Sequence, residues 1–170
     1  MKRAGIAAAI GFIAAIVAAN YVTTAYGMIP VGPFGLTATA GTFFAGAVFV
    51  LRDAVQDAAG KRAVLALIVL GIGLSYIVSD PFIALASAVA FGLGEFVNTA
   101  IYTPLRSKGY VRAAIASNVV AAVVDTFLFL WIAGFPIAGA WQGQMFAKLV
   151  VTAAAVIAVL SYRARSKGSA

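Results

Sequence analysis

Three apolar stretches of the chain each carry one charged side chain with an amide nearby. The charge and its amide are three, seven or four residues apart, so the two would share one face of an α-helix. A charge in the hydrocarbon of a bilayer costs about 2.5–3.5 kcal/mol on insertion scales, so it normally faces a protein interior or a wet cavity. The six candidate binding residues are Glu95 with Asn98, Asp125 with Asn118, and Lys148 with Gln144.

These three charges are expected at overlapping depths. The basic ends of their helices are predicted near Thr103, Arg112 and Tyr162. At 1.5 Å per residue the charges lie about 12–21 Å from those ends, near the middle of a hydrocarbon core about 30 Å thick. The six side chains are therefore predicted to meet in one site.

The formal charge of this predicted site is −1, from two carboxylates and one ammonium. Either one carboxyl is protonated or a cation, such as a bound ligand, completes the site. The amides supply donors and acceptors, as recognition of a small polar heterocycle requires. A structural alternative stays open, in which Asp125 and Lys148 form an ion pair that locks two helices and the amides link helices.

Further polar candidates lie in or directly after the first two apolar runs. Asn20 is near the far end of the first run. Asp53 and Gln56 follow the second and are candidates for gating or coupling, although Asp53 and Asp57 also fit a solvated helix end. Aromatic rings could stack on a ligand, but in membrane helices they more often face lipid or pack. The stacking candidates are Phe43 and Phe44, within a larger set of Phe91, Phe96, Phe127, Phe129, Trp131 and Phe146.

Composition places the chain in the membrane. Hydrophobic residues make up 64% of it and charged residues 10%, against about 25% charged in a soluble domain, and the mean hydropathy is +1.04. The chain has no cysteine and no histidine, which removes thiol chemistry, disulfides and the commonest zinc ligands. No nucleophile–base set is evident, so we expect neither an enzyme nor a cofactor.

The fold class predicted is an all-α integral membrane protein with one domain, residues 1–170. Proline and glycine in the segment from Met28 to Gly35 predict a loop over residues 25–35. Gly60 is expected to end the second helix. The six predicted transmembrane helices are at about 4–24, 36–52, 63–79, 81–103, 113–133 and 137–162.

Lysine and arginine predict the orientation. The N-terminus, the second and fourth connections and the C-terminal tail hold eleven of the twelve cations, Arg52 included, and Lys148 is the twelfth. With six helices all eleven fall on one side, so both termini are expected in the cytoplasm of a prokaryotic cell, with the protein in the inner membrane. This explains a pI near 10.1 better than a nucleic-acid partner does.

Several segments occur in an order and spacing that carry a family resemblance. One is the block from Gly41 to Ala63, with its aromatic pair, Asp53 and Gly60. The others are the motif Ala19-Asn20-Tyr21 in the first run, the motif Gly94-Glu95-Phe96-Val97-Asn98, the stretch from Asn118 to Thr126, and Lys148. Together these segments resemble the queuosine-precursor transporter family, also called vitamin-uptake-transporter-like, and the first block resembles the second span of that family.

The resemblance implies a six-helix importer of 7-deazaguanine precursors of queuosine. It implies a small-molecule substrate and contact with membrane lipid, and a homo-oligomer stays open. One alternative is the substrate-binding membrane subunit of an ATP-driven, energy-coupling-factor type vitamin importer, with ATPase partner subunits. The other is a structural or assembly protein of the membrane, which would bind no ligand.

Overall fold

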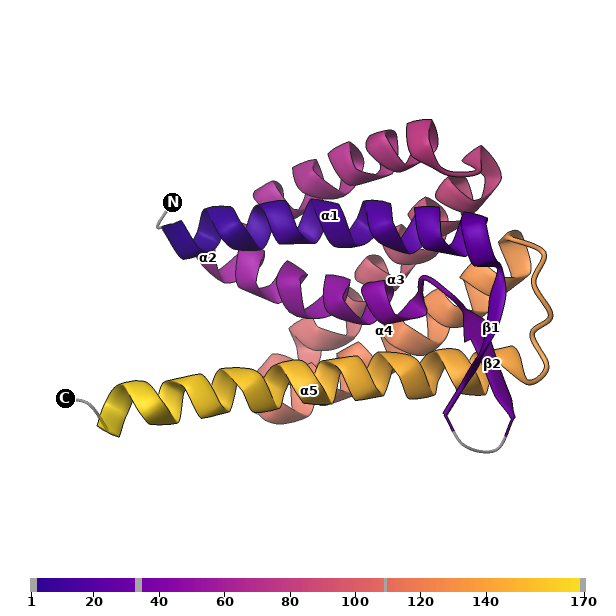
Figure 1. Cartoon of the computed structure of the whole chain (residues 1–170). Coiled ribbons are helices and arrows are strands. Elements are labelled where there is room, and N and C mark those ends of the chain that lie inside the picture. Colours follow the sequence, from indigo (N-terminus) through magenta and orange to yellow (C-terminus); the bar gives the residue numbers. More distant parts are fainter. Residues whose placement is uncertain (1–2, 33–34, 109, 169–170) are drawn as a thin grey trace.

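The computed structural model describes residues 3–32, 35–108 and 110–168 and is built almost entirely of helices (Figure 1). Of the described helices, those at Ala4–Tyr26, Thr42–Val78 and Pro81–Leu105 are long and apolar enough to cross a membrane. The elements in order are α1 (Arg3–Tyr26), β1 (Met28–Val31), β2 (Leu36–Thr39), α2 (Thr42–Val78), α3 (Pro81–Leu105), the 3₁₀ turn η1 (Arg106–Lys108), α4 (Tyr110–Ile132) and α5 (Ala140–Gly168).

Helix α2 is broken at Gly60. Its φ of 80° and ψ of 171° are not helical and suit a residue without a Cβ. Figure 1 shows the ribbon reversing there, so residues 42–59 and 61–78 form two antiparallel arms. The predicted end of a helix at Gly60 is thus confirmed, and the two arms correspond to the second and third predicted helices. The free ends of α1 and α5 lie at the same end of the bundle.

The segment between α1 and α2 was wrongly predicted. Instead of a loop and a helix starting at Leu36, the chain forms an antiparallel hairpin in which Met28 is opposite Thr39, and the helix begins at Thr42. Val31 and Ala38 are buried, so the hairpin has a packed face. The last helix likewise begins at Ala140, after a glycine with positive φ, rather than at residue 137.

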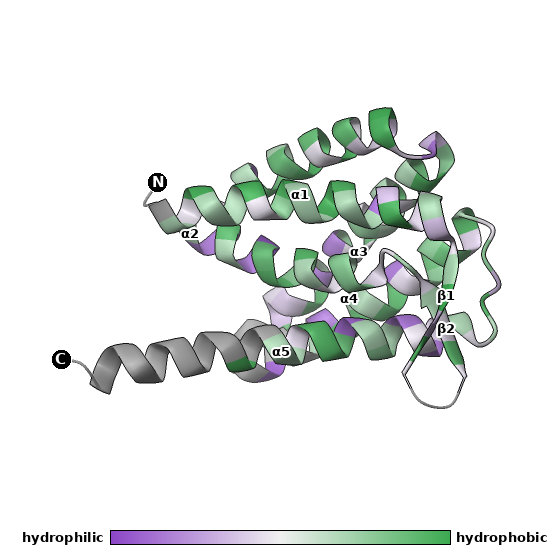
Figure 2. Ribbon diagram, viewed as in Figure 1, coloured by the Kyte–Doolittle hydropathy of each residue, from purple (hydrophilic) through white to green (hydrophobic). Residues whose placement is uncertain are grey.

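Hydrophobic residues predominate along the described helices (Figure 2), and many large apolar side chains are exposed. Val69 and Phe96 are each 71% exposed and Ile77 is 78% exposed, whereas Asp125 and Lys148 are buried. This distribution suits a surface in contact with lipid and an interior that holds the polar groups. The buried apolar cluster between α1 and α2 consists of Phe12, Ala15, Ile16, Val48, Val55, Val64 and Ile68.

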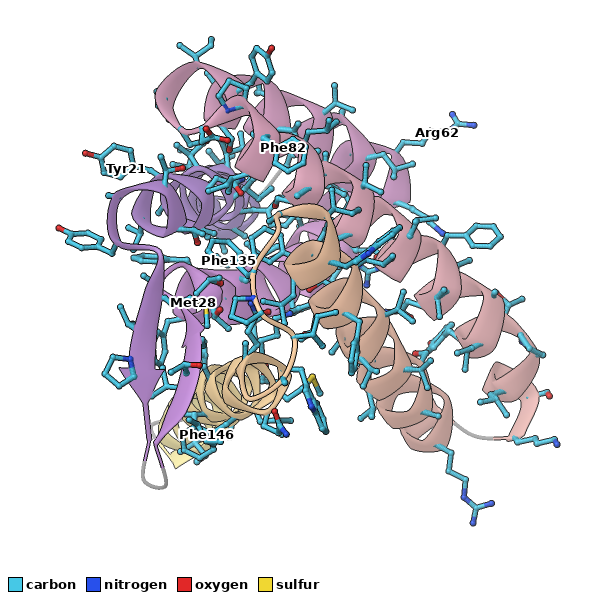
Figure 3. All side chains as sticks on the ribbon, turned by 90° about the vertical axis from the view of Figure 1, so that its right-hand side faces the viewer. Tyr21, Met28, Arg62, Phe82, Phe135 and Phe146 are labelled. Carbon is cyan, nitrogen blue, oxygen red and sulfur yellow. The ribbon has the colours of Figure 1, made fainter. Side chains whose placement is uncertain are left out.

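The hairpin packs on α5 at the end of the bundle opposite the free ends of α1 and α5. Figure 3 looks onto this end and shows Phe146 of α5 beside the hairpin. A Cβ added to Gly32 would lie 2.7 Å from the Phe146 ring. A Cβ added to Gly143 of α5 would lie 2.1 Å from the carbonyl oxygen of Thr37. Backbone therefore touches backbone where the hairpin meets α5.

Replacing Gly143 by alanine is expected to lower the stability of the protein by about 1–3 kcal/mol, because the Cβ forces the hairpin away from α5. The midpoint of thermal unfolding in detergent measures the loss. Gly92→Ala is the matched control, since a Cβ at that helical glycine meets nothing within 4 Å. Equal midpoints for the two variants would contradict this account of the packing.

Candidate functional site

A buried ion pair joins α4 to α5. The Lys148 ammonium donates to the Asp125 carboxylate over 2.6 Å and to the Thr126 hydroxyl over 2.7 Å. Asp125 is 8% exposed and Lys148 is 4% exposed. Charges that are removed from water need close partners of opposite sign, and here each has one. The pair agrees with the structural alternative considered for the sequence, and its surroundings decide what else it can do.

Glycines on two neighbouring helices let the backbone close around this pair. A Cβ on Gly94 of α3 would lie 3.3 Å from the Ala121 carbonyl oxygen and 3.4 Å from the Asp125 Cβ. A Cβ on Gly46 of α2 would lie 3.3 Å from the Lys148 Cα. Small residues of this kind permit close approach of membrane helices, so α2 and α3 enclose the ion pair.

The ion pair forms part of the wall of a cavity of about 60 Å³ between the helices, here called the central cavity. Helices α1 to α5 and the hairpin all contribute to this wall, so it gathers residues from the whole length of the chain. Its polar wall residues include Asn20, Thr39, Thr42, Ser87, Asp125, Gln144 and Lys148, and its aromatic rings are Phe49, Phe91 and Phe129.

The amides of the central cavity are held by hydrogen bonds that leave part of each group free for a ligand. The Gln144 side-chain nitrogen donates to the Thr39 hydroxyl over 3.1 Å, and that hydroxyl lies 2.9 Å from the Thr42 hydroxyl. The Asn20 side-chain nitrogen bonds the Ile16 carbonyl and the Ser75 hydroxyl. Because an amide has two donor hydrogens and an acceptor oxygen, both amides keep capacity to orient a polar ligand.

A second polar cluster lies closer to the basic ends of the helices. Arg52 of α2 bonds Glu95 of α3 and also Asp53, the latter over 2.7 Å. The Asn98 nitrogen donates to the Asn118 oxygen over 2.8 Å and so links α3 to α4. The six predicted residues are therefore divided: Asp125, Gln144 and Lys148 line the central cavity, whereas Glu95, Asn98 and Asn118 belong to the second cluster.

Arg52 corrects the predicted charge of −1. Arg52 was predicted to be a loop cation, but it lies inside α2 with its side chain 12% exposed, and it pairs with Glu95, whose side chain is 10% exposed. The two buried carboxylates thus face two cations, and neither needs a proton or a bound ligand to balance it. The position of Arg52 in an apolar helix was the sequence signal for this ion pair, since a buried arginine in such a helix requires a carboxylate partner.

Two further cavities continue from the central cavity toward the basic ends of the helices. The intermediate cavity has about 380 Å³ and lies between α2, α3, α4 and α5. The vestibule has about 300 Å³ and a mostly polar wall that includes Asp53, Gln56, Asp57 and Lys61. Gln56 places its side-chain oxygen where no described residue bonds it.

The remaining candidates lie apart from the central cavity. Asp53 has a side chain that is 58% exposed and lines the vestibule and the intermediate cavity. Phe43 and Phe44 are 39% and 40% exposed, and neither is in the wall of any of the three cavities. The rings on the central cavity, Phe49, Phe91 and Phe129, come from later turns of α2 and from α3 and α4.

Comparison with known proteins finds a matching family model. The family model described as "Putative vitamin uptake transporter" matches residues 76–162, which is just over half of the chain. The matched range contains Glu95, Asn98, Asn118, Asp125 and Lys148, and so includes both ends of the buried ion pair. The comparisons with curated proteins and with solved structures each found no match.

Proposed function

Because the chain belongs to the family described as "Putative vitamin uptake transporter", we propose that it carries a small polar heterocycle across the membrane through the central cavity. The proposed substrate is a 7-deazaguanine precursor of queuosine, such as 7-cyano-7-deazaguanine. The observation that carries the proposal is the Asp125–Lys148 pair, set between two amides and three aromatic rings in a buried cavity.

The chemistry of that wall suits a flat heterocycle with several N–H groups. A carboxylate accepts two parallel N–H bonds, so the Asp125 side chain can bind the donor edge of a guanine-like ring. Gln144 keeps one free N–H donor and its oxygen, and Asn20 keeps its oxygen, so Gln144 can give and accept a hydrogen bond at other positions of the ring and Asn20 can accept one. The rings of Phe49 and Phe91 offer apolar faces for stacking. Binding would thus combine a polar edge with an apolar face, as most small-molecule sites do.

Charge balance favours a neutral substrate. Since Glu95 is paired with Arg52 and Asp125 with Lys148, a neutral ring enters without changing the net charge of the buried groups. A 7-aminomethyl compound would bring an extra cation into a site that is already balanced. The cyano compound is therefore the preferred candidate, whereas an unbalanced site would have favoured the aminomethyl cation.

The proposal includes six transmembrane segments with both termini in the cytoplasm. The two arms of α2 supply two segments, and α1, α3, α4 and α5 supply the others. Apart from the two cations within helices, Arg52 and Lys148, the lysines and arginines of the described residues lie toward helix ends on the side of the Gly60 break and of η1. Basic residues favour the cytoplasmic side, which supports this orientation.

Single cysteines test this orientation cleanly because the chain has none. A membrane-impermeant maleimide should label the Ala138→Cys variant in intact cells, and should label Ser107→Cys only after the membrane is permeabilised. Both positions are exposed, and they lie in the connection before α5 and in η1. Labelling of Ser107→Cys but not Ala138→Cys in intact cells would reverse the topology.

The substrate proposal is tested by thermal stabilisation of the purified protein. A ligand that binds only the folded state stabilises it by about 2.7 kcal/mol at a hundred times its Kd. We expect 7-cyano-7-deazaguanine to raise the unfolding midpoint in a concentration-dependent way. Guanine and common vitamins form the comparison panel. No shift with any deazaguanine would refute the proposed substrate. An equal shift in an Asp125→Asn variant would refute the proposed role of Asp125 in binding that substrate.

A further inference from the structure

The three cavities form a series along the bundle, separated by few side chains. The intermediate cavity and the vestibule share four wall residues, and the central and intermediate cavities share only two, Phe49 and Lys148. The four are Arg52, Asp53, Asn98 and Asn118. Since the chain order of α2 and α5 carries both helices from this wall toward the basic end, Phe49 and Lys148 stand between the central cavity and that end.

Lys148 is held in this wall by bonds that can be exchanged. Its ammonium bonds Asp125 and Thr126 on α4 and lies 6.0 Å from the centre of the Phe49 ring on α2. The side chain thus reaches from α5 to the neighbouring helices across the boundary between the two cavities. A lysine has a flexible four-carbon stem, so release from Asp125 would let it leave the boundary without movement of the backbone.

The volumes of the two cavities indicate what an opening of this boundary would allow. Pockets that hold drug-sized ligands usually measure about 300–1,000 Å³, far more than the roughly 60 Å³ of the central cavity. The intermediate cavity has about 380 Å³. If the two were joined, a bicyclic ring could lie against Asp125 and continue toward the vestibule.

We propose that Lys148 is the inner gate of the transport path. Paired with Asp125, its side chain closes the central cavity toward the basic end, and released from Asp125 it joins the central and intermediate cavities. At the opposite end the hairpin packs on α5, and Gln144 donates to Thr39. Gln144 and Lys148 are one turn apart on α5, so this helix contributes both to the proposed gate and to the contact with the hairpin. The use of the opening for transport rests on the proposed function, but the gate itself does not.

Accessibility of the central cavity tests the gate without any substrate. Ser87→Cys places a thiol in the wall of the central cavity, in a chain that otherwise has no cysteine. Two variants carry this reporter together with Asp125→Asn, which avoids an unpaired carboxylate: one has Lys148→Ala and the other Lys148→Met. Methionine keeps most of the length of the lysine side chain, whereas alanine removes it. The rate of modification by a charged methanethiosulfonate is measured on purified protein.

The alanine variant is expected to react about tenfold faster than the methionine variant, because the reagent reaches the cavity without local opening of the structure. Leu149→Ala with the same reporter is the matched control, since Leu149 lines the intermediate cavity but not the central one, and it should react slowly. Equal rates for alanine and methionine would overturn the gate.

Two checks separate the gate from misfolding and from the proposed substrate. An Ala15→Cys reporter in the buried apolar cluster between α1 and α2, which lines none of the three cavities, should react equally slowly in all backgrounds if each variant is folded. Faster reaction of Ala15→Cys in the alanine variant alone would assign the effect to unfolding and would remove support for the gate. Because no substrate is present, failure of the gate leaves the stabilisation by 7-cyano-7-deazaguanine to be judged separately.

Discussion

Asp125→Ala is expected to lower the stability of the protein by about 3–5 kcal/mol, because the Lys148 ammonium stays buried and loses its carboxylate. Thr126 remains as a hydrogen-bond acceptor, but a hydroxyl does not neutralise the charge. The same substitution removes the proposed acceptor of the heterocycle. Thermal unfolding in detergent and uptake of labelled 7-cyano-7-deazaguanine by cells should therefore both show a large loss.

A neutral replacement of the pair separates stability from transport. The double variant Asp125→Asn with Lys148→Met leaves no buried charge, so its stability should return to within about 1–2 kcal/mol of the natural pair. Uptake should not return, because asparagine has an NH₂ donor in place of one carboxylate oxygen and so cannot accept two parallel N–H bonds. A double variant as unstable as Asp125→Ala would show that charge pairing is not what the site requires. Normal uptake by the double variant would exclude Asp125 as a residue that binds the substrate.

Arg52→Ala should cost more stability than Glu95→Ala, although both break the same ion pair. Without Arg52, the Glu95 carboxylate is left in a site where it is 10% exposed, at an expected cost of about 3–5 kcal/mol. Without Glu95, Arg52 keeps its bond to Asp53, so the expected cost is about 1–2 kcal/mol. The difference between the two unfolding midpoints measures the asymmetry.

Asp53→Ala provides the control for this comparison. The Asp53 side chain is 58% exposed, so its bond to Arg52 resembles a surface ion pair, which contributes about 0–1 kcal/mol. A loss of stability for Asp53→Ala as large as that for Arg52→Ala would mean that Arg52 acts through its bond to Asp53 rather than by neutralising Glu95. Equal losses for Arg52→Ala and Glu95→Ala would mean that Asp53 does not hold the guanidinium.

Much of the helical fold could be predicted from the lengths of the apolar runs and from Gly60. These signals are local: a run near 20 residues satisfies its own backbone in hydrocarbon, and a glycine permits the break. The hairpin was missed because each strand has only four residues and the segment between Gly27 and Gly35 is apolar and contains prolines, as irregular loops also do. What makes it a hairpin is its packing on α5, which is far away in the sequence.

The candidate site was predictable in its residue types but not in its partners. Spacing along a helix places Asp125 and Asn118 on one face, but the rotation of each helix decides which neighbour that face meets. Asn118 meets Asn98, and Asp125 meets Lys148. Arg52 was missed as a partner because it precedes Gly60 by eight residues, which is about 12 Å along a helix and well inside it. Counting it with the loop gave the wrong charge for the site.

The hydrogen bond between Thr39 and Gln144 joins residues that are 105 positions apart. The hairpin leaves the ribosome before most of the helices do, but the surface on which it packs is made only with α5. The central cavity therefore remains incomplete until α5, the last of the described helices in chain order, has been made, because Thr39 and Asp125 take their partners Gln144 and Lys148 from it. The order of synthesis thus delays the closure of this compartment until after the other described helices exist.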